Sequence, residues 1–320
     1  MSKYNLDLDY LIPMIDISKD ELKEIIAEAD IIIMENNENH ALSNSEELAV
    51  AYLKKAQSMQ KLVEAAELET EDIDKINITA TDDGAQNTIK KLLEKVLELS
   101  PDKPEALMQM GKVLFRTPEE NYGHIEKARD MYSRAIELKP NYPAAYNNRG
   151  TTYTYSSSDH SNFINKMKDI PDEFENATFS GSFTICIPDK DEIRKGIADY
   201  TEAIRLRSHD PVYYYNRGNC YLKLEEHEKA IEDYTNAINF SSTEFKKVTK
   251  LFHIRGLEFM RIKEYEKAIC DFTESINLGP DYIDTLFLRA KCYLFIGEHD
   301  KAKADLAEFR RLKIEKTTNL

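Results

Sequence analysis

The chain has 320 residues and a net charge of -15 at pH 7. Such an acidic excess argues against nonspecific binding to nucleic acid or to an anionic membrane surface. No apolar run approaches the ~20 residues of a membrane span, and the first residues lack the basic and apolar regions of a secretory signal. The sequence therefore predicts a cytoplasmic protein, and its 32% of charged residues suits long helices with solvated faces.

The first third of the chain carries helix-start signals but no regular repeat. Ser18 and Ser43 each begin a Ser-x-x-Glu capping box, which predicts helices that run to about Met34 and Leu68. Acidic, unpatterned residues then predict a loop up to residue 83, followed by a helix that ends at about Leu99. The helices on either side of this loop resemble a degenerate opening repeat.

One pattern of small and bulky residues recurs through the rest of the chain. It is clearest around Gly218, which is followed by a small residue, a bulky one and another small one at Ala230, Tyr234 and Ala237. Small residues facing rings let two antiparallel helices approach closely. Similar slots recur around four more anchors, namely Gly111, Gly150, Gly256 and Ala290.

The anchors are 39, 68, 38 and 34 residues apart. Their slots resemble the tetratricopeptide repeat, a helix-turn-helix with a 34-residue period. This resemblance implies an all-α fold, a right-handed α-solenoid of antiparallel helix pairs with an N-terminal helical extension. Two parts are expected, an acidic helical region and linker at 1–83 and a repeat array at 84–320. The five expected repeats are 104–140, 143–209, 211–244, 249–282 and 283–316.

The second expected repeat is about twice the length of the others. Residues 155–191 break the pattern between its two helices, and their segment FSGSFTICIP is β-branched and aromatic around Ser-Gly. That composition favours a hairpin over a helix. We interpret 155–191 as a partly β or irregular insertion in the turn of this repeat.

Nothing in the sequence predicts catalysis, a cofactor or a metal site. The chain lacks a phosphate-binding GxxxxGK[ST] loop, an HExxH motif and metal ligands at finger-like spacing. His227 and His299 recur at one repeat position, and His253 has no sequence partner for acid-base work. The four cysteines form no CxxC and are predicted to be buried thiols; they are Cys186, Cys220, Cys270 and Cys292.

In the family that the chain resembles, the first helix of each repeat lines a concave groove that binds a peptide or a partner helix. By that resemblance the groove residues are Lys112, Asn147, Asn148, Tyr215, Asn216, Asn219, Lys250, His253 and Lys291. By the same resemblance the lining positions lie six, three and two residues before each anchor and one, four and five after it. Over all of them six residues are basic and two acidic, which favours an acidic ligand. Arg116, Lys223 and Arg261 have an alternative role, because cations near helix C-termini are stabilising there. The family's clamp for chaperone tails is matched only at Asn216 and Lys250.

The sequence therefore predicts a non-catalytic scaffold or adaptor that binds a protein or peptide. The alternative is a dedicated regulatory or targeting subunit of an enzyme, bound through the insertion and the N-terminal region. A homodimer through the C-terminal helix is a further expectation. Residues 1–40 carry a charge of -7. This arm either masks the groove, or residues 19–34 stack as an extra helix on the array.

Overall fold

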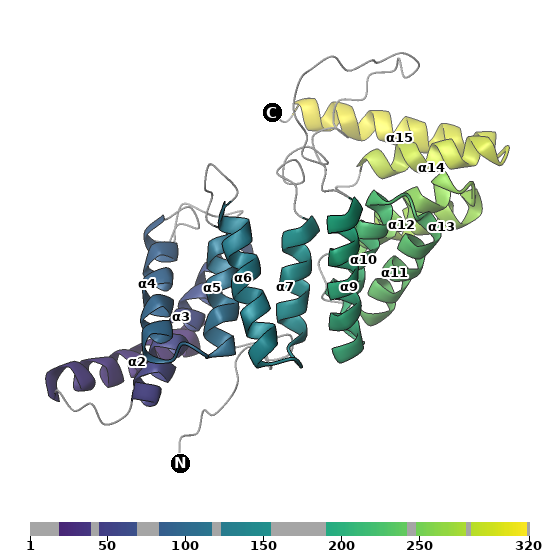
Figure 1. The fold of residues 1–320 in the computed structure, drawn as a ribbon. Coiled ribbons are helices and arrows are strands. Elements are labelled where there is room, and N and C mark those ends of the chain that lie inside the picture. The colour runs from purple at the N-terminus through teal and green to yellow at the C-terminus, as the bar shows by residue number, and fades with distance from the viewer. Residues whose placement is uncertain are drawn as a thin grey trace. The chain divides into compact units, whose positions relative to one another are not determined.

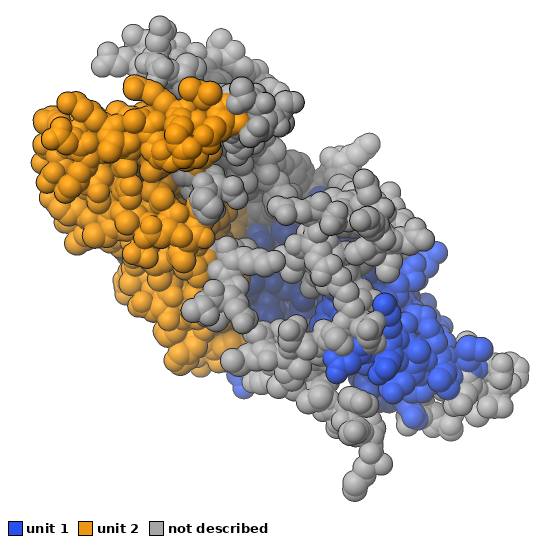
Figure 2. All heavy atoms as spheres, turned by 180° about the vertical axis from the view of Figure 1, so that it is seen from behind, with its two compact units in different colours: residues 1–152 blue, residues 153–320 orange. Residues whose placement is uncertain are grey.

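The computed structural model describes residues 19–39, 45–68, 83–116, 123–154, 190–241, 248–279 and 283–318. These residues form thirteen α-helices and, within the same ranges, no strand (Figure 1). The all-α prediction is confirmed. The chain divides into two compact units, residues 1–152 and 153–320, which Figure 2 colours separately. None of the described helices is both long and apolar enough to cross a membrane.

Unit 1 is a series of helices in which each packs on the next as far as α6 (Gly123–Leu138). Its core joins Ala49 and Leu53 of α3 (Ser45–Leu68) to Ile89 and Leu93 of α4 (Asp83–Leu99). The helix pair that was expected to open the array therefore forms. The helices are α2 (Lys19–Asn39), α3 (Ser45–Leu68), α4 (Asp83–Leu99), α5 (Pro104–Arg116), α6 (Gly123–Leu138) and α7 (Pro143–Thr154).

Helix α2 continues five residues beyond the expected end at Met34. It packs on α3, buries Leu22 and Ala29, and places Asp30 in an ion pair with Lys55. Of the two alternatives for the N-terminal arm, residues 19–39 thus follow the stacking one. Residues 1–18 lie outside the described part of the chain.

Unit 2 continues the same arrangement, with every helix packed on its neighbours in sequence (Figure 1). Helix α10 begins at Pro211 because Asp210 accepts a hydrogen bond from the Val212 amide, 3.0 Å away, as an N-cap. The helices are α9 (Lys190–Leu206), α10 (Pro211–Lys223), α11 (His227–Phe240), α12 (Val248–Arg261), α13 (Tyr265–Leu278), α14 (Ile283–Phe295) and α15 (His299–Thr318).

The small slots sit at the tight contacts that the sequence pattern predicts. A Cβ added to Gly218 would lie 2.8 Å from a ring carbon of Tyr234, and one on Gly256 would lie 2.7 Å from Phe272. Gly111 faces Tyr132 in unit 1 in the same way, at 2.5 Å. Those rings are fully or almost fully buried. Glycine suits these positions because an added Cβ would force the facing ring to shift.

The turn between the helices of a pair also repeats. Glu225, Lys263 and Gly297 follow their anchors by seven residues, and all three have positive φ, at 61°, 65° and 81°. The next amide donates back to the first helix, as Glu226 does to the Tyr221 carbonyl at 2.9 Å. This is a helix ending with a left-handed residue, for which glycine is best suited.

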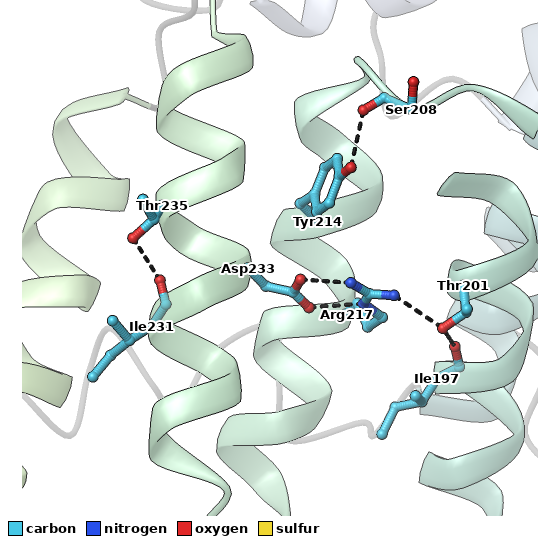
Figure 3. Close-up of polar contacts among 8 residues, drawn as sticks. All are labelled: Ile197, Thr201, Ser208, Tyr214, Arg217, Ile231, Asp233 and Thr235. Atoms are coloured by element: carbon cyan, nitrogen blue, oxygen red, sulfur yellow. Dashed lines mark hydrogen bonds and ion pairs between the residues drawn. The ribbon is translucent and has the colours of Figure 1, made fainter. Parts of the chain in front are cut away.

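An arginine one position before the anchor ties each repeat of unit 2 to the preceding one. Arg217 makes two 2.8 Å bonds to the Asp233 carboxylate and a 3.1 Å bond to the Thr201 hydroxyl of α9 (Figure 3). Thr201 itself donates to the Ile197 carbonyl, so its oxygen is oriented toward the arginine. Two further sets repeat this contact, Thr235, Arg255 and Asp271, and then Thr273, Arg289 and Asp305.

Helix α15 differs from the earlier second helices on one face. In α11 and α13 this face packs against the next repeat. At positions where α11 carries Ile231, Thr235 and Ile238, all partly buried, α15 carries Lys303, Ala307 and Arg310, all exposed. Polar and small residues at these slots suit a helix face that lies in water.

The sequence also predicted an insertion, a domain boundary and buried cysteines. Of the expected insertion at 155–191, residues 155–189 with the predicted hairpin lie outside the described ranges, whereas Lys190 and Asp191 already belong to α9. The division at 83/84 stays a prediction, while the compact units divide within α7. Cys220 and Cys292 are buried as predicted, but the prediction is wrong for Cys270, which lies on the exposed side of α13. Cys186 is not among the described residues.

Candidate functional site

The nine predicted groove residues are divided between the two units. Lys112, Asn147 and Asn148 belong to unit 1. In that unit the Asn147 amide donates to the Asn148 side chain at 3.2 Å, and Asn148 approaches the Met108 sulfur of α5 at 3.6 Å. Lys112 is half-buried on α5. The two asparagines are thus engaged with each other and with a neighbouring first helix.

The other six residues lie on three first helices of unit 2. We call them the first-helix row, and they are Tyr215, Asn216 and Asn219 of α10, Lys250 and His253 of α12, and Lys291 of α14. The oxygen of Asn219 accepts a 2.8 Å hydrogen bond from the Tyr234 hydroxyl. Burial raises the pKa of Tyr234 far above its usual value, so this hydroxyl keeps its proton and acts as the donor.

The two lysines of the row each lie over an aromatic ring. The Lys250 ammonium is 5.8 Å from the ring centroid of Tyr215, which belongs to the neighbouring first helix. The Lys291 ammonium is 4.7 Å from the ring of Phe287 on its own helix. Within the described part of the chain, neither lysine has a carboxylate oxygen within 4.0 Å. Their charge is therefore stabilised by rings and leaves the ammonium donors to a ligand.

His253 is the buried member of the row. It is 8% exposed, and its Nδ1 is 2.8 Å from the hydroxyl of Thr285, a fully buried residue of α14. Burial, with a smaller effect of the Lys250 charge, lowers the pKa of His253 to about 4. A neutral imidazole at pH 7 connects α12 to α14 and so positions the two lysines relative to each other.

Two other predicted groove cations are used within the protein. Lys223 donates a 2.9 Å hydrogen bond to the Thr154 carbonyl, at the end of α7. Arg261 lies 3.4 Å from the buried carboxylate of Glu258. This agrees with the alternative role at helix ends for Lys223, although the helix end concerned is not its own. The basic surplus available to a ligand on this row therefore comes from Lys250 and Lys291.

Three apolar residues near the row were among the lining positions but not among the selected candidates. Phe287 supports Lys291, and Leu294 and Phe295 are 47% and 64% exposed at the end of α14. The prediction from sequence favoured polar side chains and therefore did not include these three residues. Among the described residues, no three His, Cys, Asp or Glu side chains gather as a metal ion would need.

Comparison with known protein families supports the repeat architecture directly. Residues 211–242 and 284–312 match the tetratricopeptide repeat, and residues 123–154 match the TPR repeat. Together with the helix pairs and their small-to-large contacts, these matches define the class. These three segments are tetratricopeptide repeats. Repeats of this kind are typical of scaffolds for protein–protein interaction.

Individual relatives share the fold or a short stretch of sequence. PilF of Pseudomonas aeruginosa is 14% identical with a TM-score of 0.52, over 84% of this chain and 93% of that one. The TPR protein YrrB, described as having an unusual peptide-binding site, is 15% identical with a TM-score of 0.48, over 68% and 90%. The translocon at the outer membrane of chloroplasts 64 of Pisum sativum is 43% identical over 53 residues, 17% of this chain. The chain spans only 9% of that protein.

Proposed function

We propose that this scaffold binds an acidic peptide segment along the first-helix row of unit 2 and carries out no catalysis itself. One observation carries the proposal, the placement of Lys250 and Lys291 over aromatic rings with no described carboxylate within ion-pair distance. The net charge of the chain is -15. The ammonium groups of Lys250 and Lys291 are available to a ligand carboxylate, because no described acid of the protein lies within ion-pair distance of them.

The contrast with the surrounding cations supports this choice. Arg217, Arg255 and Arg289 each hold a buried carboxylate of the following helix. Lys229 and Lys267, on second helices, each pair with a glutamate three residues away. A ligand carboxylate would have to displace these internal partners. At Lys250 and Lys291 it would only add a charge-assisted hydrogen bond, which contributes more than a neutral one.

Two asparagines of the row would hold the backbone of a bound peptide. Asn216 and Asn219 lie one turn apart on α10, and the side-chain amide of Asn219 keeps its N–H donors while its oxygen accepts from Tyr234. An amide donor suits a peptide carbonyl, and the lysines suit acidic side chains. The unit 1 residues Lys112, Asn147 and Asn148 are a second candidate surface, which we propose as separate.

A binding titration with matched charge changes tests this proposal. A short dye-labelled peptide rich in glutamate is titrated with the full chain and followed by fluorescence anisotropy. Lys250→Glu and Lys291→Glu should each weaken binding by about tenfold or more, since each removes a charged hydrogen bond. Lys267→Glu and Lys301→Glu change the net charge equally but lie on second helices, so they should leave binding within about twofold. Equal losses in all four variants would refute a site on the row.

The two alternative readings make different predictions for the same protein. A dedicated enzyme subunit bound through residues 1–83 and 155–191 would keep its partner when Lys250 and Lys291 are reversed. A homodimer through α15 receives little support, because its outward positions Lys303 and Arg310 are polar and exposed. Sedimentation equilibrium of the wild type and of Arg310→Glu decides this point, since a dimer through that face should respond to the reversal.

A further inference from the structure

The C-terminal end of unit 2 breaks the pattern of the earlier first helices. Five residues after their anchors, α10 and α12 carry the cations Lys223 and Arg261, whereas α14 carries Phe295. Phe295 is 64% exposed, and the adjacent Leu294 is 47% exposed. Large apolar side chains that gather on a surface mark interaction sites more often than isolated ones do.

Phe295 is held in place by a second ring. Its ring stacks on that of Tyr265, the first residue of α13, with centroids 4.7 Å apart and planes 14° from parallel. Tyr265 takes the position that α11 and α15 give to His227 and His299. One face of the Phe295 ring is therefore covered within the protein, and its orientation is fixed before a ligand arrives. Such preorganisation lowers the entropy cost of binding.

A cation lies one helical turn before this apolar surface. Lys291 precedes Phe295 by four residues on α14, about 6 Å along the helix axis. The sole acid among the twelve lining positions of α12 and α14 is Asp284. It lies about 10 Å from Lys291 along the helix axis, in the direction away from Phe295. Glu258 is buried with His227 and Arg261, and Glu298 is paired with Lys301. The nearby acids therefore leave the charge of Lys291 to an incoming group.

We propose that the end of α14 is a docking point for an extended acidic segment with a large apolar side chain two positions from an Asp or Glu. In an extended chain, side chains two positions apart point the same way and are about 6.6 Å apart. That spacing matches the separation of Lys291 from Phe295. The acidic residue would contact Lys291, and the apolar one would cover Leu294 and the free face of Phe295. This inference rests on the proposed function and names the ligand motif of its C-terminal end.

The chain contains no tryptophan, so a tryptophan in a peptide reports its own surroundings. The probe is a dye-labelled Gly/Ser peptide with one Glu two positions from one Trp. Companion peptides replace Trp by Ala, replace Glu by Gln, or place Glu next to Trp. Each should bind about tenfold more weakly than the probe, the scale of one aromatic contact or one charged hydrogen bond. The Trp emission of the probe should shift to shorter wavelength on binding.

A protein variant separates this inference from the proposed function. Phe295→Lys restores the residue type of the earlier repeats, and because Phe295 is exposed the variant should fold like the wild type. It should remove both the tryptophan preference and the emission shift while the Glu preference remains. Leu278→Lys, at another exposed apolar residue, is the matched control and should change neither.

Three outcomes would overturn parts of the account, and they are distinguishable. Equal binding of the Trp and Ala peptides, with Gln still weaker than Glu, overturns the docking point and leaves the acidic row intact. Equal binding of the two Glu spacings overturns the two-position motif. If the probe and a glutamate-rich peptide both fail to bind, the proposed function fails as well.

Discussion

Arg255 and Asp271 form a bidentate ion pair, with bonds of 2.8 and 2.7 Å, at the contact between α12 and α13. The Asp271 side chain is 6% exposed, and a third bond at 2.9 Å links Arg255 to Thr235 of the preceding repeat. Burial raises the pKa of Asp271, and Arg255 offsets part of that rise. One arginine thus connects three helices from two repeats.

Removing one partner of this pair should be far more damaging than removing both. Arg255→Met leaves the Asp271 carboxylate buried and unpaired and should lower the free energy of unfolding by about 3–5 kcal/mol. Adding Asp271→Leu should recover most of that loss, because no buried charge remains. Denaturant unfolding of the two single variants and the double variant measures this coupling. Additive losses would show that the pair does not act as a unit.

The contact of Gly218 with Tyr234 should not accept a side chain. Gly218→Leu should overpack it and cost roughly 1–3 kcal/mol or more, measured as a fall in melting temperature. The last repeat provides the control, because it carries Ala290 with the smaller Leu306 at the same slots. Gly218→Ala combined with Tyr234→Leu should therefore be tolerated better than Gly218→Ala alone. An unchanged melting temperature in Gly218→Leu would contradict the slot assignment.

The left-handed turn residues offer a gain in stability. Glu225 and Lys263 have positive φ, where glycine avoids a strain of about 1 kcal/mol. Glu225→Gly and Lys263→Gly should each raise the free energy of unfolding by roughly 0.5–1 kcal/mol after the entropy cost of glycine. Gly297→Ala, at φ 81° with no atom near the added Cβ, isolates the backbone effect and should do the reverse. A loss in the two glycine variants would mean that their side-chain contacts outweigh the strain.

The buried His253 should make stability depend on pH. Its pKa is lowered to about 4 in the folded protein, against about 6.5 in the unfolded chain. Between these values the unfolded chain binds more protons, so stability should fall as pH drops from 6.5 to 4, by up to about 3 kcal/mol from this group. Urea unfolding of His253→Gln, which keeps a polar group near Thr285, should show a weaker pH dependence in that range. An identical slope in both proteins would exclude His253 as the source.

The fold was predictable from the sequence because its contacts are local and repeated. Gly218 and Tyr234 are sixteen residues apart, and the same offset returns at Gly256 and Phe272, so the pattern reports the helix contact itself. The wrong expectation for Cys270 has a similar origin. Its position two after Ala268 points away from the packed side of α13, which helical spacing alone could have indicated.

The candidate site was less accessible to sequence reasoning. Lys223 and Lys250 occupy equally plausible lining positions, yet the first binds the Thr154 carbonyl and the second lies over a ring of the neighbouring helix. Which partner a long side chain takes depends on residues from other repeats. The dispensability of residues 155–191 and masking by residues 1–16 stay predictions, because these segments lie largely outside the described ranges.

Amide hydrogen exchange of the full chain with and without a saturating glutamate-rich peptide tests the central claim most directly, since it locates the ligand. Binding slows the local openings of the helices that it contacts. The added protection should fall on α10, α12 and α14, and Lys250→Glu combined with Lys291→Glu should abolish it. Protection on the second helices α11, α13 and α15 alone, or protection that survives the two reversals, would contradict binding along the first-helix row.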